Sequence, residues 1–167
     1  VTSIDKQKLQ ATTKLWRQVA NQVAKDYPDV TLEHQLVDSA AMLMITRPSH
    51  FDVLVTENLF GDILSDEASV LPGTLGVTPS ASHSANGPSL YEPIHGSAPD
   101  IAGQDIANPV SMILSVAMML RESFGQEEGA ARIELAVDAA FKEGVLTADL
   151  GGRASTQEMT QAIIKNL

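Results

Sequence analysis

The chain has 167 residues with 21 acidic and 11 basic side chains, a formal net charge of −10, and 44% of its residues are hydrophobic. This length and apolar content suffice for a buried core, whereas the negative charge argues against nucleic acid and an anionic membrane surface as partners. Cysteine is absent, so disulfides and thiolate chemistry are excluded. The chain has neither an apolar run of about 18 residues nor a signal peptide, so we expect a cytoplasmic protein.

The first part of the chain alternates expected strands and helices, a pattern typical of α/β architecture. The expected elements are a strand at 1–4, a helix at 5–25, a strand at 31–37, a short helix at 39–46 and a strand at 51–56. Leu9 is one of the apolar positions of the first helix. The opening strand has no initiator Met before it, which suggests a fragment.

Lys6 is placed at the start of the first expected helix, with Asp5 as the cap. A cation is slightly unfavourable near a helix N-terminus, and positions that break a local rule are candidates for function. The alternative is an ordinary solvated lysine. His34 is expected to be a packed or surface residue of its strand, and nothing distinguishes His83 in its loop.

Two carboxylates, Asp62 and Asp66, stand four residues apart in a segment that is expected to be helical after Gly61. Residues at this spacing share one helix face, where like charges repel by a few tenths of a kcal/mol. A hard divalent cation would reverse that repulsion, because it prefers oxygen ligands. The alternative is that Asp62 caps the helix and Asp66 is solvated.

The composition changes at Gly73, after which small and β-prone residues are followed by a long loop at 86–107. Loops of more than about 15 residues in compact domains are usually functional. The elements expected beyond it are helices at 109–124 and 127–142 and a last helix that ends at 167. Asn108 is expected to cap the first of these helices, and Ser155 with Glu158 forms a capping box for the last. No Gly-x-Gly-x-x-Gly occurs, so a dinucleotide, if bound, is not held by the usual Rossmann turn.

Four segments together resemble the isocitrate/isopropylmalate dehydrogenase family of β-decarboxylating dehydrogenases. They are 1–6 (VTSIDK), 34–38 (HQLVD), 58–66 (NLFGDILSD), and 92–103 (EPIHGSAPDIAG) continuing to 106–109 (IANP). The resemblance covers the whole chain, and the last two segments are highly specific for the family. The Ile4-Asp5-Lys6 string favours its isopropylmalate branch over the malate/tartrate branch.

The resemblance implies an enzyme that oxidises (2R,3S)-3-isopropylmalate with NAD and decarboxylates it to 2-oxoisocaproate in leucine biosynthesis. It implies Mg²⁺ or Mn²⁺ bound by Asp62 and Asp66 of one subunit and Asp38 of the other, in a homodimer with a shared active site. Such a cation stabilises the negative charge that develops on the substrate oxygen. Lys6 matches the family's catalytic lysine, which assists deprotonation of the hydroxyl directly or through water.

The long loop resembles the cofactor-binding segment of the same family. The cofactor-binding residues implied are Glu92, His95, Gly96, Ser97, Ala98, Asp100 and Asn108. Small side chains allow the backbone to approach a nucleotide. By resemblance His95 contacts the adenosine portion, Asp100 accepts bonds from the ribose hydroxyls, and Asn108 touches adenine. The alternative is a structural turn rich in Gly and Pro.

The chain departs from the family pattern in two respects. Lys8 stands where an Asn that contacts the nicotinamide end is expected, and the family's chains are about twice as long. We therefore expect the C-terminal half of a two-domain fold, with 1–72 in the substrate-binding and dimerisation domain and 73–167 in the NAD-binding domain. The resemblance implies that the other half supplies the substrate-binding arginines and a proton-donating tyrosine, so this chain alone is expected to be inactive.

Two other functions stay open from the sequence. One is a D-malate/tartrate or homoisocitrate dehydrogenase of the same family, because the resemblance implies that the substrate side-chain pocket lies upstream. The other is an inactive acidic fragment that binds metal or assists assembly.

Overall fold

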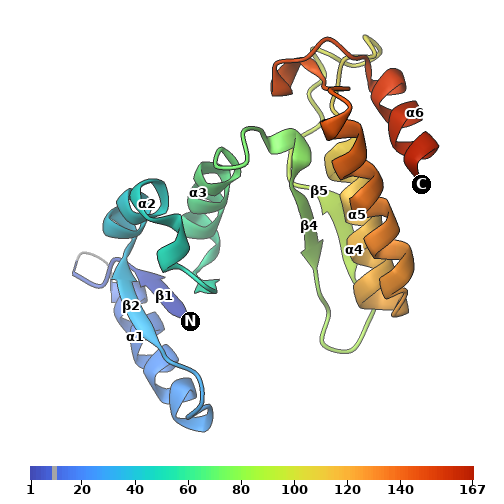
Figure 1. Cartoon of the computed structure of the whole chain (residues 1–167). Helices are drawn as coiled ribbons and strands as arrows, with labels where there is room; N and C mark the ends of the chain where they lie inside the picture. Colours follow the sequence, from blue (N-terminus) through green and yellow to red (C-terminus); the bar gives the residue numbers. More distant parts are fainter. Residues whose placement is uncertain (9–10) are drawn as a thin grey trace. The chain divides into compact units, whose positions relative to one another are not determined.

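The computed structural model describes residues 1–8 and 11–167, which form two compact units, Val1–Leu71 and Pro72–Leu167 (Figure 1). Leu9, expected on the apolar side of the first helix, lies outside the described residues. None of the helices in the described part of the chain is long and apolar enough to cross a membrane. Strands and helices mix in both units, as the α/β prediction required.

The first unit is built on a parallel three-stranded sheet in the order β2-β1-β3. Its elements in chain order are β1 (Thr2–Asp5), α1 (Ala11–Val23), η1 (Ala24–Asp26), β2 (Glu33–Leu36), α2 (Val37–Thr46), η2 (Pro48–His50), β3 (Leu54–Val55) and α3 (Asn58–Ser69). Parallel neighbours need crossover connections, which α1 and α2 provide. The predicted alternation of strands and helices in this part of the chain is therefore confirmed.

Three details of the first unit differ from the sequence-based expectation. Asp5 does not cap a helix, because it is the last residue of β1 and the described helix begins at Ala11. Lys6 consequently lies in the turn after β1, so the unfavourable helix-dipole position inferred for it does not exist. The helix that carries the two aspartates begins at Asn58, where Glu57 caps it by accepting bonds from two backbone N–H groups. Asp62 is therefore not the cap.

The core of the first unit forms where α2 and α3 pack beside β1. Its buried side chains are Ile4, Ala40, Met44, Phe60 and Leu64. This packing buries one face of helix α3 in the core and leaves Asp62 and Asp66 exposed.

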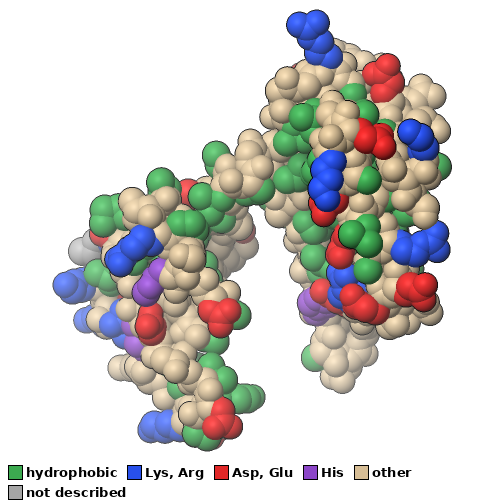
Figure 2. All heavy atoms as spheres, viewed as in Figure 1, with side chains coloured by type: hydrophobic (Ala, Val, Ile, Leu, Met, Phe, Trp, Pro, Cys, Tyr) green, Lys and Arg blue, Asp and Glu red, His purple; other side chains and the backbone are tan. Residues whose placement is uncertain are grey.

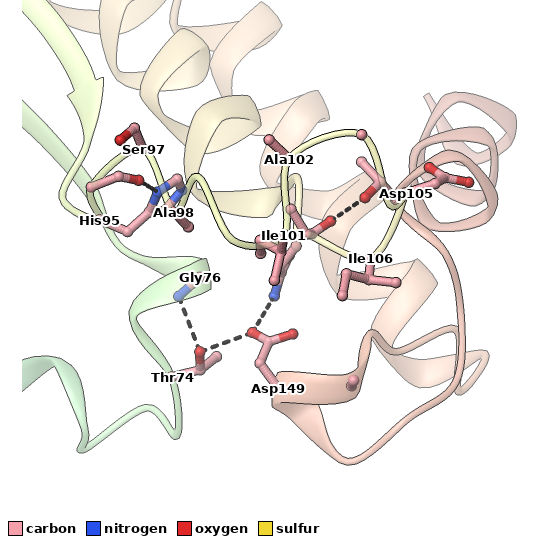
Figure 3. Close-up of a pocket in the computed structure, with 16 residues that line it drawn as sticks. Thr74, Gly76, His95, Ser97, Ala98, Ile101, Ala102, Asp105, Ile106 and Asp149 are labelled. Atoms are coloured by element: carbon pink, nitrogen blue, oxygen red, sulfur yellow. Dashed lines mark hydrogen bonds between the residues drawn. The ribbon is translucent and has the colours of Figure 1, made fainter.

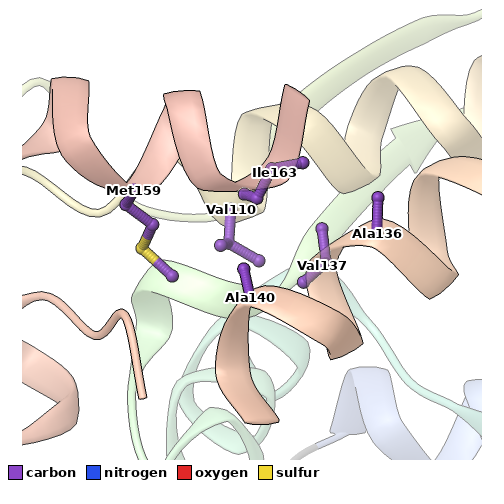
Figure 4. Packing of buried hydrophobic residues seen from close by; sticks show 6 residues of the cluster. All are labelled: Val110, Ala136, Val137, Ala140, Met159 and Ile163. Atoms are coloured by element: carbon purple, nitrogen blue, oxygen red, sulfur yellow. The ribbon is translucent and has the colours of Figure 1, made fainter. Parts of the chain in front are cut away.

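The second unit combines an antiparallel hairpin with three helices. Its elements are η3 (Leu75–Val77), β4 (Pro79–Ser82), β5 (Leu90–Pro93), α4 (Val110–Phe124), α5 (Glu127–Lys142), η4 (Ala148–Leu150) and α6 (Thr156–Asn166). Helix α4 packs on both strands and on α5, and α5 packs on α6. The buried residues of this core are Val110, Ala136, Val137, Ala140, Met159 and Ile163 (Figure 4).

Strand β5 corrects the expectation of a loop without strands or helices over 86–107, since Leu90–Pro93 pairs with β4. The predicted capping box is confirmed, because Ser155 and Glu158 exchange both bonds at the start of α6. Helix α4 begins at Val110 with Pro109 at the N-cap position, yet the Asn108 Oδ1 atom accepts the Val110 N–H at 3.0 Å. Gly125 ends this helix in the left-handed conformation at φ 62°.

Apolar side chains remain on the surface of both units (Figure 2). On α1, the apolar side chains of Leu15, Val19 and Val23 are 61%, 49% and 48% exposed. Helix α4 also exposes Met112 and Phe124. These surfaces are of the kind that a further part of a protein or a partner covers.

Candidate functional site

Lys6 and Asp38 form an ion pair at the carboxyl ends of two neighbouring parallel strands. The Nζ atom of Lys6 lies 2.8 Å from Oδ2 of Asp38, with the two side chains 23% and 63% exposed. Lys6 directly follows β1 and Asp38 is in the first turn of α2, after β2. Ligands bind preferentially outside the carboxyl ends of strands in open α/β sheets. The hydrogen bond from Lys6 lowers the pKa of the Asp38 carboxyl below its usual value.

Asp62 and Asp66 lie four residues apart on α3, both exposed. Asn58 donates a long bond of 3.3 Å to Oδ1 of Asp62, and neither carboxylate has a salt bridge to a described residue. Two unneutralised carboxylates on one helix face suit a hard cation such as Mg²⁺, which also keeps several waters. Among residues 1–8 and 11–167, however, no three His, Cys, Asp or Glu side chains group as a metal site. The pair therefore fits part of a ligand set rather than all of it.

A cleft of about 970 Å³ opens in the second unit, lined by the long loop, η3 and η4 (Figure 3). Five of the predicted cofactor-binding residues line it: His95, Gly96, Ser97, Ala98 and Asn108. A cleft of this size is typical of a small-molecule or cofactor site. The structure thus brings most of the predicted cofactor-binding residues to one place.

Glu92 and Asp100 are absent from the described lining of the cleft. Glu92 is exposed on β5, where it pairs with Ser80 of β4. Asp100 is exposed in the loop, and its backbone oxygen accepts a bond of 2.7 Å from the Gln104 side chain. Their roles toward a cofactor stay predictions.

Asp149 organises one wall of the cleft, and the sequence did not single it out. Its Oδ2 atom accepts bonds from Thr74 at 2.8 Å and from the Asn108 amide at 3.0 Å (Figure 3). Its Oδ1 atom accepts a bond from Thr147 at 2.5 Å. Burial raises the pKa of the Asp149 carboxyl, but these three hydrogen bonds outweigh it and leave the pKa lowered. Asp149 is therefore held as a carboxylate and fixes the orientation of the Asn108 amide. The only sequence signal was the Gly151-Gly152 turn that follows it.

The backbone of the cleft is held in conformations that side chains seldom adopt. Ala98 has φ 41° and Asp105 has φ 56°, both in the left-handed region although neither is glycine. Such residues persist where the surrounding structure over-determines them, often at ligand sites. Asp105 is tied to α6, because its Oδ1 atom accepts the Gln157 N–H at 3.0 Å.

The first unit is a parallel sheet with the Lys6–Asp38 ion pair at its carboxyl edge, and the second unit carries a loop-lined cleft, which together define an α/β protein with two candidate sites. The family model described as isocitrate/isopropylmalate dehydrogenase matches residues 1–163. The chain belongs to the isocitrate/isopropylmalate dehydrogenase family.

Named relatives agree with that assignment. The chain is 77% identical over all 167 residues to the 3-isopropylmalate dehydrogenase of Streptococcus thermophilus, of which it covers 48%. It is 72% identical over 99% of its length to that of Lactococcus lactis, again covering 48% of the relative. The chain thus spans about half the length of the curated relatives it matches.

Solved structures show the same fold. An isocitrate dehydrogenase from Methylococcus capsulatus matches with a TM-score of 0.92 and 43% identity, over 99% of this chain and 49% of that one. A beta-decarboxylating dehydrogenase from Thermococcus kodakarensis matches with a TM-score of 0.85 and 39% identity, over 99% and 48%. The expected isopropylmalate/isocitrate dehydrogenase-like fold is therefore confirmed.

Proposed function

We propose that this chain is the C-terminal half of an NAD-dependent 3-isopropylmalate dehydrogenase. The reaction is oxidation of (2R,3S)-3-isopropylmalate followed by loss of carbon dioxide to give 2-oxoisocaproate, a step of leucine biosynthesis. The observation that carries the proposal is the 77% identity, over all 167 residues, to the 3-isopropylmalate dehydrogenase of S. thermophilus. The charged pair at the sheet edge and the cleft of the second unit support the proposal.

Lys6 is proposed as the group that takes up the proton of the substrate hydroxyl, directly or through water. Its side chain is only 23% exposed and is directed by Asp38 at 2.8 Å. A proton acceptor has to lie within hydrogen-bond reach of the proton it removes, and a partly buried, oriented amine meets that condition better than a mobile surface lysine. Only the neutral amine can act directly.

Asp62 and Asp66 are proposed to hold Mg²⁺ or Mn²⁺ together with Asp38 from the second subunit of a homodimer. Their exposure on α3 leaves both carboxylates accessible to ligands outside this chain. When bound, the cation supplies stabilisation of negative charge on the substrate oxygen. A site completed by a second subunit would account for the lack of a three-residue cluster among the described residues of one chain.

NAD is proposed to occupy the cleft of the second unit, where it would accept the hydride. Gly96, Ser97 and Ala98 carry small side chains on the lining of the cleft and let the backbone approach the nucleotide. His95 would contact the adenosine portion, and Asn108 the adenine. Asp100 is assigned to the ribose end, where a carboxylate selects free hydroxyls, and Glu92 is proposed as a further cofactor-binding residue.

The two units are proposed to have separate tasks. Residues 1–72 would belong to the substrate-binding and dimerisation domain, and 73–167 to the NAD-binding domain. The remainder of each domain, with the groups that bind the substrate's carboxylates, would come from the half that the relatives have in addition. The isolated 167-residue chain is therefore proposed to have no dehydrogenase activity.

A chimera tests the chemistry of this chain. In it, the matched 48% of the S. thermophilus relative is replaced by residues 1–167. NADH formation from 3-isopropylmalate in the presence of Mn²⁺ supports the proposal, and a folded chimera without it contradicts the proposal. Because the substrate side-chain pocket is expected upstream, substrate choice is tested on the complete product of the gene that encodes this chain. A panel of 3-isopropylmalate, D-malate and homoisocitrate should show the first to be preferred.

A further inference from the structure

Asp5, next to the proposed catalytic lysine, is a fully buried carboxylate with two partners. Its side chain is 0% exposed and its Oδ2 atom lies 2.5 Å from Nε of Arg17, on α1. Its Oδ1 atom accepts the backbone N–H of Gln7 at 3.0 Å. The carboxylate therefore joins the helix α1 to the backbone on the far side of Lys6.

Burying such a pair is unfavourable unless the geometry is good, and apolar residues of similar volume are often as stabilising. The attachment of α1 to β1 also has a second bond, from Trp16 Nε1 to Ser3 Oγ at 3.0 Å. Fold stability alone therefore gives a weak reason for a charged pair at this position. The Asp5 carboxylate makes one contact that an apolar residue could not replace, the hydrogen bond that it accepts from the Gln7 N–H.

The Asp5 side chain and the Gln7 N–H enclose Lys6 in a turn stabilised by a side chain that bonds to the backbone two residues on. This turn fixes the direction in which Lys6 leaves the end of β1. The Lys6 side chain then reaches Asp38, with its Nζ atom 2.8 Å from Oδ2 of Asp38. The position of the Lys6 amine thus depends on the position of the Asp5 carboxylate, which Arg17 anchors.

We propose that the pair of the buried Asp5 carboxylate and the partly buried Arg17 positions Lys6 for proton transfer, an inference that rests on the proposed function. Arg17 and Asp5 are positioning residues, because neither is expected to touch substrate or cofactor. Small displacements of a reacting group can lower a rate severely. Loss of the pair should therefore lower kcat and leave NAD binding unchanged, because the cleft lies in the other unit.

The test compares four variants of the chimera by thermal unfolding and by steady-state kinetics. Arg17→Met leaves the Asp5 carboxylate buried and unpaired, so it should lower both the unfolding temperature and kcat. The double variant Asp5→Leu/Arg17→Met removes both charges and should recover most of the stability. Its kcat should stay about tenfold or more below the parent's, with the KM for NAD within about twofold. Arg17→Lys should restore part of the kcat that Arg17→Met loses, and Lys14→Met, exposed on the same helix, should behave as the parent.

A double variant that is stable and turns over like the parent would overturn the positioning role. If the double variant does not fold, a folded Arg17→Met variant with the parent's kcat overturns it equally. Failure of the proposed function has a different signature, because the unmodified chimera would then form no NADH. An active chimera with an unaffected double variant contradicts the positioning inference alone.

Discussion

The Lys6 ammonium and the Asp38 carboxylate lie 2.8 Å apart although their positions in the sequence are separated by helix α1 and strand β2. They meet because β1 and β2 are parallel neighbours, with Asp5 opposite Leu36 at their carboxyl ends. Lys6, one residue after β1, and Asp38, two residues after β2, therefore arrive at the same edge of the sheet. Two of the family-matched segments are joined there by the fold of a single chain.

Replacement of Asp62 by Asn in the chimera should weaken Mn²⁺ binding and lower turnover by orders of magnitude, because one of the two proposed ligand carboxylates on α3 loses its charge. Isothermal titration with Mn²⁺ and the rate of NADH formation measure the two effects. Asp52→Asn, an exposed carboxylate upstream of the same helix, is the matched control and should change neither. Unaltered Mn²⁺ affinity and turnover in Asp62→Asn would exclude it as a ligand.

Asp100 should make the enzyme prefer NAD to NADP, because a carboxylate accepts bonds from a free 2′-hydroxyl and repels a 2′-phosphate. Asp100→Lys should reduce or invert the preference for NAD, measured as the ratio of kcat/KM for NAD to kcat/KM for NADP. Asp138→Lys, the same charge change on the exposed side of α5, should leave the ratio as it is. A parent chimera that uses both cofactors equally well would show that the role given to Asp100 is wrong.

Gly76→Ala should disturb the cleft wall around Asp149. A Cβ atom at residue 76 would lie 2.6 Å from Oδ2 of Asp149 and 2.8 Å from Cβ of Asn108, so both side chains would have to move. We expect a loss of about 1–3 kcal/mol in unfolding free energy, the usual cost of overpacking, and a higher KM for NAD.

Gly129→Ala is the control for that substitution. Its added Cβ would make only ordinary contacts, the nearest at 3.8 Å, and it lies inside helix α5. It should raise the unfolding free energy by about 0.5–1 kcal/mol and leave the KM unchanged. Equal KM values for NAD in Gly76→Ala and the parent would show that the cleft wall around Asp149 does not contribute to cofactor binding.

His34 should make the first unit less stable as the pH falls below about 6.5. Burial and the nearby Arg17 charge lower its pKa, with Asp5 opposing them, and its buried Nδ1 atom has no hydrogen-bond partner in the described structure. Between the lowered folded pKa and the unfolded value the unfolded chain binds more protons, so stability rises with pH across that window. Urea unfolding of the chimera at several pH values should show a slope that is smaller in His34→Gln. An identical slope in the parent chimera and in His34→Gln would show that His34 does not cause the pH dependence of stability.

The sequence predicted those features that local chemistry determines. The Ser155–Glu158 capping box and the strands at both sides of α1 were predicted because their signals lie within a few residues. The cleft-lining stretch from His95 to Ala98 was found only through its resemblance to a family.

The features missed depend on contacts between distant residues. Strand β5 exists because it pairs with β4 across a turn, which its own composition of Leu90–Pro93 does not indicate. Asp149 approaches Asn108 and Thr74 only through the tertiary fold. Asp5 was mistaken for a helix cap because an Asp before a helical pattern usually is one, whereas here it is buried against Arg17.

The central claim is that this chain carries the proton-accepting lysine of a metal- and NAD-dependent dehydrogenase, and the Lys6→Met variant of the chimera tests it most directly. NADH formation from 3-isopropylmalate should fall by orders of magnitude, because the variant lacks an amine at the carboxyl end of β1. NAD affinity, measured by titration, should be unchanged, since the cleft belongs to the second unit. A folded Lys6→Met chimera that forms NADH at the parent's rate would contradict the claim.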